Sequence, residues 1–142
     1  MIEAQRVVKY VYDTLVADNG AGGVHTLLSG RIYRDQVPRT VQTWPALVVS
    51  LVSAVNTNTT GGRRVFLTVA VDIHFIDQGG DFTAINAAAD RADTVLQNTS
   101  GAANSVSVVE LVQDDVRAYL ENDEGQTWAH LVATYSTPAY AT

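Results

Sequence analysis

Two apolar segments separated by a polar turn constrain the fold of this chain more than any other feature of its sequence. Residues 46–55 are apolar at nearly every position and rich in β-branched side chains, so both faces of the strand that they predict need cover. Residues 65–75 alternate apolar with polar side chains, which predicts a half-buried strand. Residues 56–62 are polar and end in two glycines, so they predict the turn of a long hairpin.

Amphipathic patterns on both sides of this hairpin predict two helices. Apolar residues recur at three- and four-residue steps over residues 2–16 and again over residues 85–96. The glycines within residues 20–23 end the first helix, and residues 24–28 have the length of one further helical turn. Asp81 stands where an N-cap residue would accept the free amide hydrogens of the second long helix.

The last third of the sequence predicts further strands. They span residues 105–112, 116–121 and 127–136, while residues 98–104 predict a loop, Asp114 and Asp115 a bend, and residues 122–125 a hairpin turn. The order of these elements predicts a single α+β domain over residues 1–142. Its β-sheet is expected to be mainly antiparallel, with a long hairpin and two helices packed on one face.

Composition excludes several classes of function. The chain has no cysteine, which rules out a thiolate nucleophile and a Cys-based metal site. Its nine basic and fifteen acidic residues give a net charge of −6, which argues against binding nucleic acid through phosphate contacts. The longest nearly apolar run, residues 46–55, is about half of the ~20 residues that span a bilayer. The first residues lack the apolar stretch of a signal peptide, so we expect a protein that stays in solution.

The polar residues form no recognisable catalytic or metal-binding motif. The three histidines, His25, His74 and His130, lack the helical spacing of a zinc protease, so a metal site requires the fold to bring His74 and His130 together. The simpler interpretation is two cross-strand or partly exposed histidines. Neither the glycines nor the serines occupy a phosphate loop or a nucleophile elbow. We therefore expect no enzymatic activity, no cofactor and no bound metal.

The apolar surface exceeds what two helices can cover. They shield one face of a sheet, yet residues 46–55 are apolar on both faces, and Trp128 and Val132 lie on the face opposite Ala129 and Leu131. A second copy of the chain would supply the missing cover most simply. The alternative is a sheet that curls over its own loops, including residues 35–45.

The order of these features resembles that of the tail terminator, or tail completion, proteins of long noncontractile-tailed bacteriophages. The resemblance covers nearly the whole chain and rests on an amphipathic first helix followed by four short motifs. They are LLSGRIY at residues 27–33, WPALVV at residues 44–49, VAVDIHF at residues 69–75 and DEGQTWAHLV at residues 123–132. It implies a small α+β subunit of a homohexameric ring that caps the tail tube, stops its polymerisation and provides the surface for head joining.

The resemblance also implies partners and a location. These are the tail tube protein, the head–tail connector protein and the head-proximal end of the tail in the virion, after assembly in the host cytoplasm, with no membrane involved. DNA would pass through the lumen without specific binding, which the net charge of −6 fits independently. Two alternatives remain open: a head-side connector or other neck protein of the virion, and a small-molecule-binding α+β domain.

Charge and polarity indicate which residues would form the interfaces. Arginine suits contacts between subunits because its planar guanidinium binds a carboxylate through two hydrogen bonds. Most basic residues gather in two places, around residues 30–45 and at the base of the long hairpin, and the hairpin tip is polar. The candidate interface residues are Arg31, Arg34, Arg39, Arg63, Arg64, Asn58, Thr59, Trp128 and, as acidic partners on a neighbouring subunit, Asp114 and Asp115.

Overall fold

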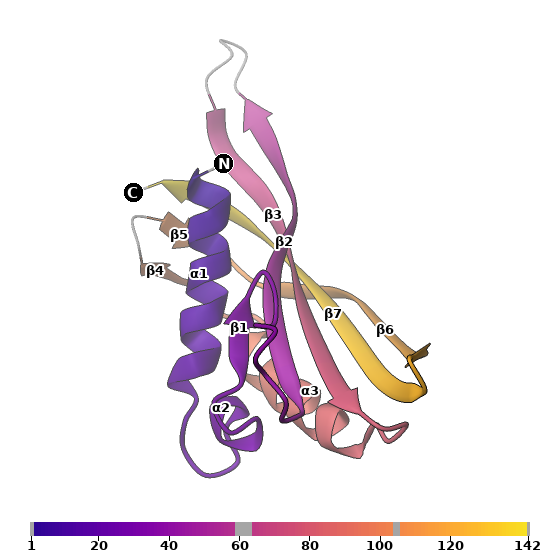
Figure 1. Cartoon of the computed structure of the whole chain (residues 1–142). Coiled ribbons are helices and arrows are strands. Elements are labelled where there is room, and N and C mark those ends of the chain that lie inside the picture. The colour runs from indigo at the N-terminus through magenta and orange to yellow at the C-terminus, as the bar shows by residue number, and fades with distance from the viewer. Residues whose placement is uncertain (1, 59–63, 104–105, 142) are drawn as a thin grey trace.

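The protein is described here from a computed structural model, which places residues 2–58, 64–103 and 106–141 (Figure 1). Within these residues the chain forms three helices and seven strands. The helices are α1 (Ile2–Ala17), α2 (Val24–Leu27) and α3 (Thr83–Leu96). The strands are β1 (Ile32–Arg34), β2 (Ala46–Asn58), β3 (Arg64–Gln78), β4 (Gly101–Ala103), β5 (Val106–Val108), β6 (Val112–Asp123) and β7 (Gln126–Ala141).

All the strands belong to one twisted sheet. Its order is β1-β2-β3-β7-β5-β4, and β6 pairs with β7 beside this path. Only the pairing of β1 with β2 is parallel among the described strands. The hairpin of β2 and β3 projects at one end of the molecule and the hairpin of β6 and β7 at the other (Figure 1). The predicted α+β class with a mainly antiparallel sheet and a long hairpin is therefore confirmed.

The helices pack on one face of this sheet, as the sequence predicts, and α2 adds a single turn to the two long helices. None of the described helices has the length and apolar character needed to cross a membrane. The core lies between the helices and the sheet and is built from the periodic apolar positions of both. It includes Val7, Val8, Val11, Leu15, Ile85, Ala88, Ala92 and Leu96 from the helices and Leu47, Val49, Val71, Ile73, Phe75, Leu131, Ala133 and Tyr135 from the strands.

Three local predictions need correction. Residues 98–104, predicted as a loop, contain β4, which pairs with β5. Asp114 and Asp115, predicted as a bend, lie inside the continuous strand β6, where the register with β7 shifts between Gln113 and Asp115. Such a bulge accommodates one extra residue without ending the strand. The predicted strand over residues 105–112 is interrupted after Val108, although Leu111 is fully buried.

The ends of several elements also differ from the prediction, among them β7, which continues to Ala141 beyond the predicted end at residue 136. β2 continues to Asn58, into the segment predicted as a turn, and α3 begins at Thr83. Asp81 nevertheless accepts the amide N–H of Thr83 at 2.9 Å through its carboxylate, close to the N-cap role that the sequence predicts. The turn between β6 and β7 is confirmed: Glu124 and Gly125 both have positive φ, 49° and 79°, which gives the tight hairpin connection that favours glycine.

Asp18 joins the three helices at the end of α1. Its carboxylate accepts the amide N–H of Val24 at 2.8 Å and two hydrogen bonds from the guanidinium of Arg91, at 2.9 and 2.8 Å. The hydrogen bond from Arg91 is the main reason that the pKa of Asp18 lies below its ordinary value. Gly23 makes this approach sterically feasible, because a Cβ atom there would lie 2.2 Å from the backbone oxygen of Asp18.

We predict that Asp18→Asn lowers the free energy of unfolding by about 1–3 kcal/mol, because three hydrogen bonds lose their charged acceptor. The measurement is urea denaturation followed by circular dichroism. Lys9→Ala is the control, since it breaks the exposed pair of Lys9 with Asp13 one turn along α1 and should cost no more than about 0.5 kcal/mol. Equal losses for the two variants would contradict the role given to Asp18.

Candidate functional site

Three of the predicted interface arginines lie together at the β1 edge of the sheet and in the loop that follows it. The Nε atom of Arg31 donates a hydrogen bond to the carbonyl oxygen of Pro45 at 2.7 Å. Arg34, the last residue of β1, has a buried Nε atom without a hydrogen-bond partner. Arg39 is exposed in the loop over residues 35–45. Within the part of the chain that the structure describes, no carboxylate forms an ion pair with any of these three arginines.

The predicted acidic partners lie at the opposite edge. Asp114 and Asp115 are exposed on β6, and the Asp115 carboxylate accepts a hydrogen bond from Arg117 at 3.0 Å. β1 and β6 are separated by β2, β3 and β7. The structure thus places Arg31 and Arg34 at one edge of the sheet and Asp114 and Asp115 at the opposite edge, so the two groups do not meet within one chain.

Half of the candidate interface residues at the long hairpin lie outside the residues that the structure describes. Thr59 and Arg63 lie outside the described residues. Asn58 and Arg64 are described as the paired ends of β2 and β3. The interface role predicted for these four residues therefore stays a prediction.

Trp128 is half-buried within its own chain. Its ring meets that of Trp44 edge to face, with ring centres 5.0 Å apart and planes at 81°. Val48 and Val132, on the same face of the sheet, are buried. Trp44, from the loop over residues 35–45, therefore helps to cover this part of the second face, which fits the alternative of a sheet covered by its own loops.

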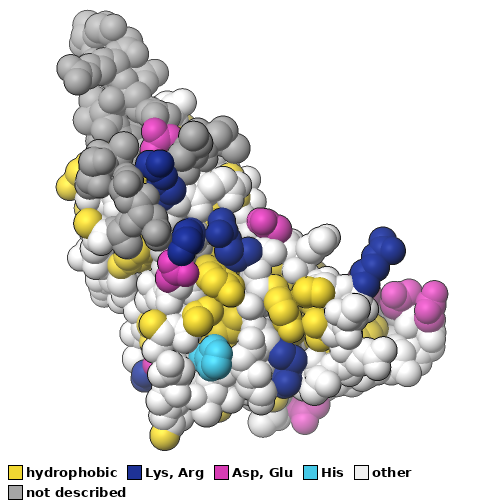
Figure 2. All heavy atoms as spheres, turned by 60° about the vertical axis from the view of Figure 1, so that its left-hand side comes forward, with side chains coloured by type: hydrophobic (Ala, Val, Ile, Leu, Met, Phe, Trp, Pro, Cys, Tyr) yellow, Lys and Arg dark blue, Asp and Glu magenta, His cyan; other side chains and the backbone are white. Residues whose placement is uncertain are grey.

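Exposed apolar side chains lie instead on two free edges of the sheet. On β6, Val112, Val116, Tyr119 and Leu120 are exposed, Leu120 to 55%. On β2, beyond the residues paired with β1, Val52 and Val55 are exposed. Hydrophobic side chains also gather near the middle of the face in Figure 2, with Lys and Arg side chains around them. A long edge strand with apolar side chains is a surface that usually meets a partner.

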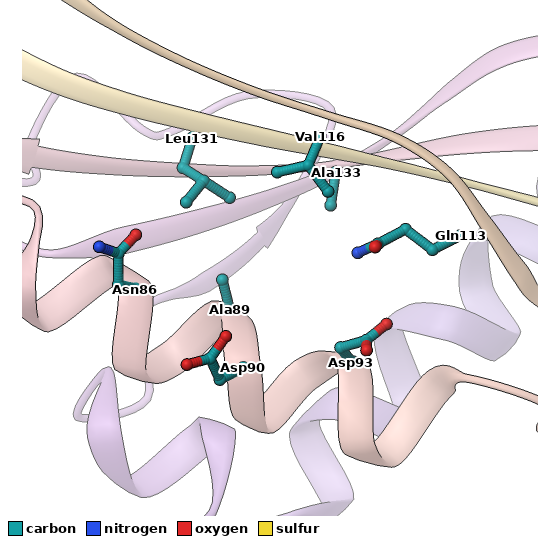
Figure 3. Close-up of a pocket in the computed structure, with 8 residues that line it drawn as sticks. All are labelled: Asn86, Ala89, Asp90, Asp93, Gln113, Val116, Leu131 and Ala133. Atoms are coloured by element: carbon teal, nitrogen blue, oxygen red, sulfur yellow. The ribbon is translucent and has the colours of Figure 1, made fainter.

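A groove lies between β6 and α3 (Figure 3). It has a volume of about 250 Å³, an apolar floor from β6 and β7, and two carboxylates on the α3 side. The lining residues are Asn86, Ala89, Asp90, Asp93, Gln113, Val116, Leu131 and Ala133. This groove could not be predicted from the sequence, because Asp90 and Asp93 occupy polar positions of an amphipathic helical pattern, which are usually in solvent.

Tyr135 fixes one side of this groove. Its hydroxyl donates a hydrogen bond to the Asp93 carboxylate at 2.7 Å and accepts one from the Gln113 amide at 3.2 Å. Burial, followed by the neighbouring Asp93, raises the pKa of Tyr135. The Asp93 carboxylate is therefore already engaged inside the chain, whereas no hydrogen bond or ion pair of the Asp90 carboxylate occurs among the described residues.

The fold does bring His74 and His130 together, on the sheet face away from the helices. Nε2 of His74 and Nδ1 of His130 are 2.8 Å apart and share a hydrogen bond. The ring of Tyr119 stacks on that of His130, and Glu121 lies 3.4 Å from its other nitrogen. No group of three or more potential metal ligands occurs among the residues that the structure describes. The two histidines form a hydrogen bond between β3 and β7, in agreement with the interpretation as a cross-strand pair.

Burial makes His74 sensitive to pH. Burial, and then the nearby His130, lower the pKa of His74, against a smaller opposite effect from Asp72. The unfolded chain consequently binds a proton at His74 at a higher pH than the folded chain does. The stability from a neutral His74 is present above the ordinary histidine pKa and is lost as the pH falls below it.

We therefore predict that the wild-type melting temperature falls as the pH is lowered from about 7.5, above the ordinary histidine pKa of 6.5, to about 5, below it. His74→Gln should reduce this fall, because glutamine does not titrate and its amide can still donate to His130. The measurement is thermal denaturation at several pH values. Asp72, Glu121, Arg117 and His130 face the site and are unchanged in the variant. An identical pH profile for both proteins would contradict the assignment to His74.

Comparison with known proteins adds three findings. The family model of tail completion protein gp17 matches residues 9–137. Among solved structures, a chain described as "Virion of native gene transfer agent (GTA) particle" has a TM-score of 0.65 and 20% sequence identity. The match covers 90% of this chain and 91% of that chain, and at this identity it shows a shared fold. No curated protein matches the sequence significantly.

Proposed function

Since the chain belongs to the family of tail completion protein gp17, we propose that it is a structural protein of a phage-like virion and acts in completing the tail. The observation that carries this proposal is the match of the family model over residues 9–137. It is the family that the sequence motifs predicted. The fold shared with a chain of a gene transfer agent virion supports it. The family description names a step of assembly and not a reaction, which fits the expectation of no enzymatic activity.

More specifically, we propose that the protein forms a ring of about six copies at the head-proximal end of the tail. The ring caps the tail tube, ends its polymerisation and offers the surface to which the head–tail connector joins, after assembly in the host cytoplasm. The exposed apolar side chains of β6 and β2 support self-association, because a lone chain leaves them in water. The net charge of −6 suits a lumen through which DNA moves without being held.

The alternatives have weaker support. A small-molecule site is usually a pocket of about 300–1,000 Å³, and the described groove, at about 250 Å³, is smaller. A head-side connector would share the ring, but the family description refers to the tail.

We expect native mass spectrometry at increasing protein concentration to find a closed ring of about six copies, with a monomer as the dissociated form. Tails assembled without the protein should exceed their normal length and fail to join heads. Electron microscopy of those tails measures both effects. Only monomers at about millimolar concentration, together with monomers in isolated virions, would contradict the ring.

A second test concerns Arg63 and Arg64. Arg64 begins β3 and pairs with the last residue of β2, next to the turn and not at the predicted base of the hairpin. Arg63→Ala combined with Arg64→Ala should weaken the ring or its docking to the tail, because it removes two charges that suit contacts with carboxylates of a neighbour. Arg6→Ala combined with Lys9→Ala removes the same charge from α1 and is the control. Infectious yield and native mass are measured. Normal assembly of the Arg63 and Arg64 variant would rule out this role.

A further inference from the structure

One row of paired residues connects the two edges of the sheet. Arg34 pairs with Val49, Val49 with Ile73, Ile73 with Ala133, and Ala133 with Val116. Residues in register on neighbouring strands point to the same face. Arg34 at the β1 edge and Val116 at the β6 edge are therefore level with each other, on the face that carries the helices.

The two ends of this row are complementary in charge. At the β1 end, the buried Nε atom of Arg34 lacks an acceptor. At the β6 end, Val116 and Ala133 line the groove whose wall carries Asp90 (Figure 3). The Asp90 carboxylate is exposed and makes no hydrogen bond or ion pair with the described residues. An unpaired guanidinium and an unpaired carboxylate thus lie at the same height and on the same face, at opposite edges.

We propose that the groove between α3 and β6 receives the Arg34 side chain of a second copy of this chain, which pairs there with Asp90. This inference rests on the ring of the proposed function and identifies the surfaces that form it. The β1 edge of one copy lies against the β6 edge of the next. Val116 and Leu120, both exposed in the single chain, are covered in this contact.

The geometry of the sheet is compatible with such a contact. β2, β3, β7 and β6 alternate in direction, and β1 is parallel to β2, so β6 runs antiparallel to β1. Suppose that one copy is related to the next by a rotation about an axis parallel to the strands. The helices of all copies then lie on the same side of the joined sheets. The β6 strand of one copy runs antiparallel to the β1 strand of the next. Because each copy uses two different edges, the contact is head-to-tail and repeats until it closes.

Further charges at the same edges agree with this arrangement. Arg39 follows β1 in an exposed loop, and Asp114 and Asp115 are exposed on β6 next to the groove. A contact of two β6 edges with each other would instead place these carboxylates against their own copies. Like charges in an interface oppose association.

A charge exchange tests the contact. Arg34→Asp alone and Asp90→Arg alone should each raise the concentration at which half of the chains are assembled by about 100-fold, since each places two like charges in the contact. Both substitutions in one chain should restore assembly, because the pair is then reversed. Asp123→Arg makes the same change of charge at the far end of β6 and should leave assembly unchanged. Native mass gives the assembly, and circular dichroism confirms the fold of each variant.

The outcomes separate this contact from the ring itself. A ring that survives both single substitutions, or that the double exchange fails to restore, overturns the contact and leaves the proposed function intact. A wild-type chain that forms no oligomer in solution or on tails overturns both.

Cysteine cross-linking gives an independent test that does not rely on charge. The sequence has no cysteine, so every disulfide formed comes from the introduced residues. Arg34→Cys and Val116→Cys in one chain lie four strand spacings apart, about 19 Å, which is too far for a bond within the chain. Oxidation should give a ladder of covalent oligomers from the double variant and none from either single variant. A covalent dimer from Val116→Cys alone, or no ladder from the double variant, would overturn the proposal.

Discussion

Backbone pairing along both edges of β7 is the interaction on which the rest of the structure depends. β7 pairs with β3 from Trp128 to Ala139 on one edge, and with β6 and then β5 on the other. Because α3 packs on β3 and β7, strand β6 extends past the helix layer and its side chains reach solvent on both faces. The free edge and the groove beside it both follow from this overhang.

The same sheet order separates charges of opposite sign. Arg31 and Arg34 belong to the β1 edge, whereas Asp114 and Asp115 belong to the β6 edge. Two copies that met through identical edges would bring like charges together, whereas a head-to-tail contact brings opposite charges together. The proposed ring needs a contact of this second kind, since two different surfaces can be repeated around an axis.

Local patterns in the sequence predicted the elements that depend on neighbouring residues in the chain. The helices and the long hairpin follow from apolar periodicity, and the tight turn follows from Gly125. Contacts between distant segments could not be predicted in this way: the His74–His130 pair depends on the register of β3 with β7, and β4 is made of small residues without a pattern. The candidate site was predicted in part. The clustering of basic residues around residues 30–45 singled out Arg34 from the sequence, but Asp90 becomes a candidate only when β6 is seen to overhang α3.

The cover of the second sheet face affects how a ring could assemble. Trp44 and Trp128 pack together within one chain, and Val48 and Val132 are buried there, so a single copy already covers this part of the second face. Association then has to bury only sheet edges and the groove, not a missing half of the core. The proposed contact depends on charge, so it should weaken with salt. In the proposed ring, such a subunit would fold before it assembles, and the end of a tail tube, by holding copies side by side, would raise their local concentration and favour closure there.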